Sequence, residues 1–301
     1  MGDRALGDGA PAKSGGALSP NRLDLWKRAL SPILCVCALA QVQRPPDISA
    51  GGVARAAQRY VDEYQHALSF LLAEEAGSQQ VLGQQGGPVG RRTTKAEIFL
   101  TFLDKERVWL AVRDVFAVDG EPVSDHVDLR SLLTSGPLSG LAQVLANQSS
   151  RFNIGSIGRN FNEPTLGLLV LDAGHRSQFK FERRRVEQVG DAMLVTLGFT
   201  ETERPTLIHG VDNANVYSKG ELIVEAGTGR VRRTFIELKQ QEFHVQLTTT
   251  YRLDERLDIW VPDVFTERYE RSATRKDAAE TITCESTYSN YRKFDVQIRI
   301  K

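Results

Sequence analysis

The five histidines are the first residues to test for chemistry, because their spacing can reveal a metal site. They are His66, His126, His175, His209 and His244. No two have the His-x-x-x-His spacing that places two ligands on one helix face, and none lies beside a cysteine. A site could still assemble from distant residues, for example from His126 with Asp114 and Asp119. We nevertheless expect ordinary surface or hydrogen-bonded histidines, no bound metal and no cofactor.

Candidate nucleophiles and acid pairs are equally sparse. Ser156 lies in a Gly-Ser-Ile-Gly string that lacks the Gly-x-Ser-x-Gly pattern of a nucleophile elbow. Glu74 and Glu75 are adjacent, so in a strand their side chains point to opposite faces and cannot act as a pair. We therefore predict no catalytic residue and no enzyme. A hydrolase assembled from distant residues is the alternative that spacing leaves open.

The charge balance gives no support for a nucleic-acid or strongly acidic partner. The chain has 38 lysines and arginines against 38 aspartates and glutamates, so we expect no nucleic-acid partner. The basic run at residues 183–185 is typical of a solvated strand end. Binding of acidic lipid head groups by this run is the alternative.

Residues 1–40 have the parts of a secretory signal peptide behind a Gly-, Ala- and Ser-rich start. Basic residues precede an apolar stretch from residue 29 to Ala40, which ends in Ala-Leu-Ala. We predict cleavage before Gln41, a periplasmic or secreted location, and no transmembrane segment in the mature chain. A buried N-terminal helix is the alternative.

The three cysteines do not predict a redox or metal centre. There are three cysteines, and cleavage after residue 40 would remove Cys35 and Cys37. Cys284 would then remain alone with no histidine close in sequence, so we predict a buried or strand-facing thiol without a catalytic role.

The elements that would position any site are mainly strands. Residues 53–64 have the apolar spacing of a helix, and residues 68–81 are predicted as a strand with a helical extension as the alternative. Strands at 96–103 and 108–118 follow. Residues 125–152 are predicted to form a helical insertion. Its apolar stripe would line a ligand groove and consists of Leu138, Leu141, Leu145 and Phe152.

From residue 165 onward the pattern is almost entirely that of strands. The predicted strands are 165–172, 177–183, 192–200, 219–226, 230–238, 243–252, 257–269, 280–287 and 291–300. Short turns make neighbouring strands antiparallel, and a series of about twelve strands usually curls or closes. We predict a mainly β (α+β) fold in one domain, residues 41–301. It would be a strongly curved antiparallel sheet or incomplete β-barrel, with an N-terminal helix and a mid-chain helical insertion.

Several strings carry a family resemblance. They are GELIVE at 220–225, TGRVRR at 228–233, LDIWVP at 257–262, and TYSNYRKF at 287–294. Their order resembles the outer-membrane lipoprotein carrier superfamily and the related periplasmic regulators of envelope stress. The chain looks most like a group of uncharacterised exported bacterial proteins, which share the RDVFAVDG string at 113–120. The resemblance implies an incomplete β-barrel with helices over its mouth, and binding of acyl chains or lipidated protein in an apolar concavity.

These patterns together predict a non-catalytic periplasmic or secreted binder of an apolar ligand, a lipid or a lipidated partner. The alternative is a structural or regulatory envelope protein whose concavity is filled and which acts through its surface. An open cavity would favour the first and a packed one the second.

Overall fold

The structure is a computed structural model, and its described residues begin at Pro45. It describes residues 45–83, 86–126, 129, 149–159, 163–210, 213–275 and 277–294.

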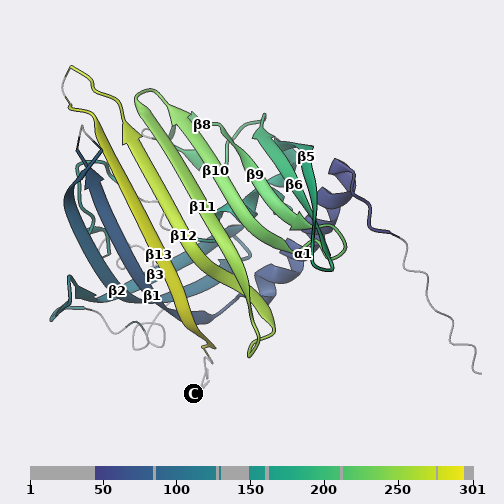
Figure 1. Cartoon of the computed structure of the whole chain (residues 1–301), viewed down its shortest axis with the longest axis horizontal. Coiled ribbons are helices and arrows are strands. Elements are labelled where there is room, and N and C mark those ends of the chain that lie inside the picture. The colour runs from purple at the N-terminus through teal and green to yellow at the C-terminus, as the bar shows by residue number, and fades with distance from the viewer. Residues whose placement is uncertain are drawn as a thin grey trace, which may run out of the picture. The chain divides into compact units, whose positions relative to one another are not determined.

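The fold is one open antiparallel sheet of 11 strands in the order β4-β3-β2-β1-β13-β12-β11-β10-β9-β6-β5 (Figure 1). The strands of its N-terminal part are β1 (Leu71–Leu82), β2 (Pro88–Leu103), β3 (Val108–Val118) and β4 (Glu121–Pro122). Those of its C-terminal part are β5 (Phe179–Val189), β6 (Ala192–Glu201), β9 (Ser218–Glu225), β10 (Val231–Gln240), β11 (Phe243–Asp254), β12 (Ile259–Arg271) and β13 (Glu280–Lys293). Pairing of β1 with β13 joins the two parts. The predicted mainly β, curved antiparallel sheet is confirmed.

The sheet has one apolar face because its strands alternate with a period of two. In β11, Val245, Leu247 and Tyr251 are buried, whereas Gln246 and Thr248 between them are partly exposed. We call the buried side the inner face. Strands β6, β9, β10, β12 and β13 place their own apolar residues in the same core.

Helix α1 (Ala50–Ala67) lies behind the sheet and covers part of the inner face (Figure 1). Ser49 caps it by accepting a hydrogen bond from the Gly52 amide (3.1 Å). The helix contacts β5, β6 and β9 and also β2, which lie in opposite halves of the sheet. Its Tyr64 packs edge-on against Trp109 of β3, with ring centroids 6.0 Å apart. The helix predicted at 53–64 is therefore confirmed and extends further at both ends.

The strand predicted at 165–172 is wrong. Residues Leu166–Leu171 form the 3₁₀ helix η1, which packs against α1 and β10. A short apolar run that is buried on all sides has no period, so its sequence does not distinguish a strand from a helical turn. Gly167 permits the close approach, because a Cβ there would lie 2.5 Å from Thr234. A second short helix, η2 (Arg176–Gln178), leads into β5.

Several boundaries also differ from the prediction, since β2 begins at Pro88 and not at residue 96, and β5 extends to Val189 and not only to residue 183. The strands predicted at 280–287 and 291–300 form the single strand β13, whose described part ends at Lys293. Residues 202–217, for which no element was predicted, carry the hairpin of β7 (Ile208–His209) and β8 (Asn215–Val216).

Asp172 joins three parts of the inner face. It is fully buried, and Gln65 of α1 donates a hydrogen bond to its Oδ1 (2.6 Å). Arg107, in the β2–β3 turn, forms an ion pair with the same carboxylate. The end of η1, the helix and the turn are therefore held at one charged group, which is fully paired as a buried carboxylate must be.

The connection from β4 to β5 has described residues on both faces of the sheet. Leu129 is buried against Leu72, Phe99 and Val112, which alternate with the inner-face residues and so lie on the outer face. Residues 149–159 instead contact inner-face residues such as Gln79 and Cys284. The predicted groove residues Leu138, Leu141 and Leu145 lie outside the described residues.

We expect Gly229→Ala to destabilise the protein by about 2–4 kcal/mol. Gly229 has a φ of +76° in the β9–β10 turn, and a Cβ there would lie 2.2 Å from the Ala56 carbonyl oxygen in α1. The measurement is urea unfolding. Gly227→Ala in the same turn is the control, because its Cβ would meet nothing within 4 Å, and its effect is expected to stay within about 0.5 kcal/mol. Equal effects of the two variants would contradict this packing of α1.

Candidate functional site

An open pocket of about 550 Å³ lies on the inner face, at the end of β10 and the start of β11. Its walls include His209, Gly210, Gln240, Gly158 and Arg159. Most of the remaining wall is apolar and consists of Ile157, Ile208, Val216, Leu238, Phe243, Val245 and Tyr269. We call it the apolar pocket.

The sheet builds one wall of the apolar pocket and the β7–β8 hairpin builds another. Leu238 and Val245 point inward from paired strands, where the two residues are direct partners. Glu201 at the end of β6 fixes the hairpin, since its buried carboxylate accepts hydrogen bonds from the Leu207 amide (2.5 Å) and the Ser218 amide (2.9 Å). Ile208 and Val216 are thereby held over the sheet.

A group of buried polar side chains, which we call the polar layer, lies on the inner face and shares Arg159 with the wall of the apolar pocket. Its central pair is Arg113 and Glu75, with Arg113 Nε 2.9 Å and 2.8 Å from the two Glu75 oxygens. Burial alone would lower the pKa of Arg113, but the neighbouring Glu75 charge outweighs burial and the pKa is raised. This arginine stays charged, and its charge is balanced by a carboxylate.

Two other acids of this layer are less well paired. Burial raises the pKa of Glu267, whose Oε2 accepts a hydrogen bond from the Tyr269 hydroxyl. Burial also raises the pKa of Glu163 to about 8, against the lowering effect of Arg113. The Glu163 Oε1 atom is buried without a hydrogen-bond partner. Both acids favour their neutral forms compared with the same groups in water.

Cys284 and Arg159 complete the layer. The Cys284 thiol is buried, as predicted, and burial raises its pKa to about 12. Arg159 Nη1 donates a hydrogen bond to its sulfur. A thiol of this pKa is not a nucleophile at neutral pH.

A second, much smaller pocket of about 50 Å³ opens within the polar layer. Its walls include Glu75, Arg113, Arg159 and Glu267, together with Phe152. We call it the polar pocket. Phe152 is the one predicted groove residue among the described residues. It is half-buried, its carbonyl accepts a hydrogen bond from Arg92 (3.2 Å), and it does not line the apolar pocket.

The histidines form no metal centre within the described part of the chain, where no three acids, cysteines or histidines cluster suitably. His126 Nδ1 does lie 3.1 Å from Asp114 Oδ2. Asp119, however, binds the Thr93 amide (2.7 Å) and pairs with Arg92. The hypothetical trio of His126, Asp114 and Asp119 is therefore not assembled.

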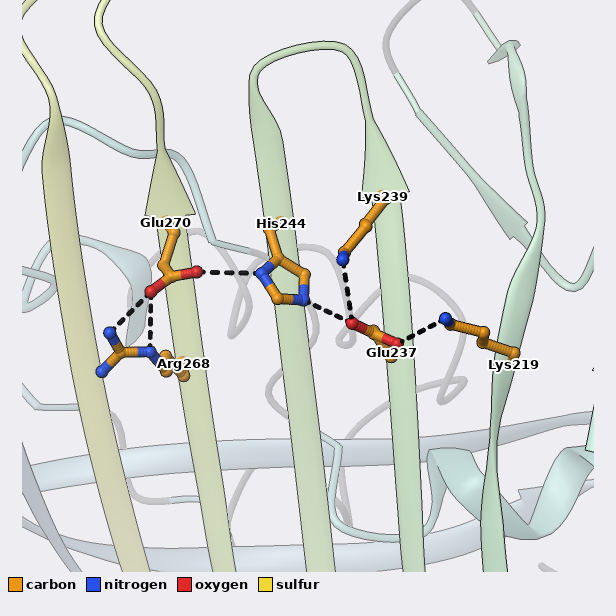
Figure 2. A network of polar contacts seen from close by, with 6 residues as sticks. All are labelled: Lys219, Glu237, Lys239, His244, Arg268 and Glu270. Carbon is orange, nitrogen blue, oxygen red and sulfur yellow. Dashed lines mark hydrogen bonds and ion pairs between the residues drawn. The ribbon is translucent and has the colours of Figure 1, made fainter. Parts of the chain in front are cut away.

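A network of charged residues crosses the outer face of β9 to β12 (Figure 2). Figure 2 shows His244 between two carboxylates, with Nε2 2.8 Å from Glu237 and Nδ1 2.9 Å from Glu270. A hydrogen bond from Lys219 is the main reason that the pKa of Glu237 falls to about 2. The basic partners of the two acids are Lys219, Lys239 and Arg268. The network links four strands on the face opposite the apolar pocket, and each of its two acids is paired with a cation.

Known proteins offer structural neighbours but no sequence relatives. No protein-family profile and no curated protein sequence matches the chain. A structure described as an outer membrane lipoprotein-sorting protein domain from Vibrio parahaemolyticus is similar over 82% of this chain and 95% of its own, at 10% identity and a TM-score of 0.32. A DUF1329 family protein from Desulfovibrio piger is similar over 83% and 95%, at 13% identity and a TM-score of 0.38. MucB in complex with MucA(peri) is similar over 79% and 99%, at 9% identity and a TM-score of 0.19.

Within the described residues, no helix is both long and apolar enough to cross a bilayer. The function proposed below rests on the chain's own pockets and side chains.

We expect the stability of Glu163→Gln, measured relative to the wild type, to be higher at pH 8 than at pH 5. With a folded-state pKa of about 8 against 4.5 in the unfolded chain, Glu163 keeps its proton in the folded protein while the unfolded chain loses it. The unfolded state then binds fewer protons, so wild-type stability falls as pH rises through this window. Between pH 5 and pH 8, the free energy of unfolding of the wild type is expected to fall by about 1–3 kcal/mol relative to that of the variant.

The measurement is urea unfolding of both proteins across that pH range. Glu203→Gln removes an exposed acid and serves as the control, with a difference from wild type that stays flat with pH. A flat difference for Glu163→Gln as well would show that the Glu163 carboxyl is solvated.

Proposed function

We propose that the protein is a non-catalytic binder of an apolar ligand, which occupies the apolar pocket. The supporting observation is the open volume of about 550 Å³ with mainly aliphatic and aromatic walls. Ligand sites usually have about 300–1,000 Å³ and this kind of lining, with a few polar groups that fix orientation. A lipid or the acyl chain of a lipidated partner has the matching chemistry.

The energetics favour a chain-like ligand. Each methylene group moved from water into an apolar environment gains about 0.8 kcal/mol, so a chain of eight or more carbons supplies several kcal/mol. The pocket walls come from the hairpin, the strand ends and residues 157–159, and they surround the ligand on several sides.

The alternative is a structural or regulatory envelope protein that acts through its surface. The specific observation in its favour is that α1 and η1 already fill the other end of the inner face with core residues such as Val61 and Leu169. A ligand therefore does not run the whole length of the concavity. The open end distinguishes the two proposals, because only a binder needs it.

Location in the bacterial envelope is part of the proposal. The signal-peptide pattern of residues 1–40 supports export, and residues 41–301 would then form the mature single domain. Envelope proteins that sort lipoproteins or regulate stress are the class that the sequence resembles.

We expect Val216→Trp to lower the affinity for the neutral apolar probe N-phenyl-1-naphthylamine by at least about tenfold. Val216 is buried in the pocket wall, and an indole there displaces ligand volume equal to about two methylene groups, each contributing about 0.8 kcal/mol. Probe fluorescence measures the affinity, and thermal melting checks the fold.

Val189→Trp is the matched control, because Val189 is exposed at the end of β5 and away from the pocket walls. Its probe affinity is expected to equal that of the wild type. Failure of the wild type to bind the probe, together with an absence of co-purifying lipid in native mass spectrometry, would favour the surface-acting alternative.

We expect the mature protein from its native host to begin at Gln41. The apolar stretch that ends in Ala-Leu-Ala directly before it matches the cleavage site of signal peptidase. N-terminal sequencing of the protein from a periplasmic or culture fraction gives the answer. An intact leader in a cytoplasmic fraction would rule out export.

A further inference from the structure

Arg159 is a buried arginine that contributes to the wall of the apolar pocket. Only 6% of the residue is exposed, and it lines both the apolar pocket and the polar pocket. A cation in that position is costly unless an anion balances it. The partners of Arg159 therefore indicate what the pocket accepts.

The hydrogen bonds of Arg159 go to neutral groups. Nη2 donates to Gln79 Oε1 (2.6 Å) and to the Ile154 carbonyl (3.3 Å), and Nη1 donates to the Cys284 sulfur. Nε is buried and has no hydrogen-bond partner. Among the residues that the structure describes, no carboxylate lies within ion-pair distance of this guanidinium.

Other inner-face arginines are paired differently. Arg113 pairs with Glu75, and Arg107 with the fully buried Asp172. The two paired arginines each have an acid that neutralises them inside the protein. Arg159 is attracted to Glu267 at longer range but has no acid within ion-pair distance, so its charge is available to a ligand that enters the apolar pocket.

We propose that the ligand is an amphiphile with an anionic head, a carboxylate or a phosphate, that binds at Arg159 while its apolar chain fills the apolar pocket. This inference rests on the proposed function and specifies its ligand class. A guanidinium suits both heads, because its planar fork of donors matches the oxygens of either group.

Glu267, which interacts electrostatically with Arg159, does not take the place of this anion. Its Oε2 is engaged by the Tyr269 hydroxyl, and burial raises the pKa of its carboxyl, which weakens its competition for Arg159. Tyr269 also lines the apolar pocket, so the head would meet a neutral hydroxyl and a guanidinium at the same end.

The test displaces N-phenyl-1-naphthylamine from the full mature protein with dodecanoate, dodecyl phosphate and 1-dodecanol at pH 8. We expect at least one anion to bind about tenfold or more tightly than the alcohol, since hydrogen bonds to charged groups contribute about 1.5–3 kcal/mol, or roughly 10- to 150-fold. The ratio of dodecanoate to dodecyl phosphate identifies which head the site prefers.

Arg159→Gln is expected to remove this preference and leave the affinity for 1-dodecanol within about threefold of wild type. Arg184→Gln is the control, because Arg184 is exposed and paired with Glu182 and Glu221. It is expected to keep the preference. If Arg159→Gln does not fold, a crystal structure of the wild type with dodecanoate decides the point by the position of the carboxylate.

The possible failures are distinct. Equal binding of the anions and the alcohol by the wild type would overturn this inference and leave the apolar-ligand function in place. So would an anion preference that Arg159→Gln retains, or a bound carboxylate that points away from Arg159. If none of the three compounds displaces the probe, or if the wild type neither binds the probe nor carries co-purifying lipid, the proposed function itself is overturned.

Discussion

The rest of the structure depends on one constraint: an open antiparallel sheet with an apolar inner face must have that face covered. Pairing of β1 with β13 extends the sheet to 11 strands but does not close it. Helix α1 supplies the cover, because it packs against strands in both halves of the sheet and buries a stripe that includes Val53, Val61 and Tyr64. Asp172 then links this helix to η1 and to the β2–β3 turn. The filled end of the concavity is the stabilising part of the molecule.

The two ends of the inner face consequently have different roles. At one end α1 and η1 pack against the sheet and form a dense core. Truncating a large side chain there would lower the free energy of unfolding by several kcal/mol. At the other end the β7–β8 hairpin lies over the strands at a distance that leaves the apolar pocket open. Glu201 fixes the hairpin through buried hydrogen bonds, and Ile208 and Val216 of the hairpin pack into the apolar core. Polar and apolar contacts together therefore hold this wall of the pocket in place.

The sequence predicted the sheet well because alternation with a period of two is a local signal, present in each of the strands β9 to β12. It failed at Leu166–Leu171, where burial on every side removes the period. It also missed the pocket, whose walls come from residues 157–159, 208–210 and 238–245, and which only the fold brings together. The raised pKa of Glu163 had no sequence signal either, because burial of one carboxyl is a tertiary property. The sequence contained no signal for Arg159 either, because only its neighbours in space show that this arginine lacks an acidic partner.

The polar layer is difficult to explain by stability alone. A buried pair such as Arg113 and Glu75 gains little over well-packed apolar residues of similar volume, because the cost of desolvation offsets much of the attraction. Arg159, with neutral partners only, is costlier still, and Glu163 is held with one oxygen unpaired. Arg159 also lines the apolar pocket, so the anionic head that we propose for the ligand would supply there the negative charge that this arginine lacks inside the protein.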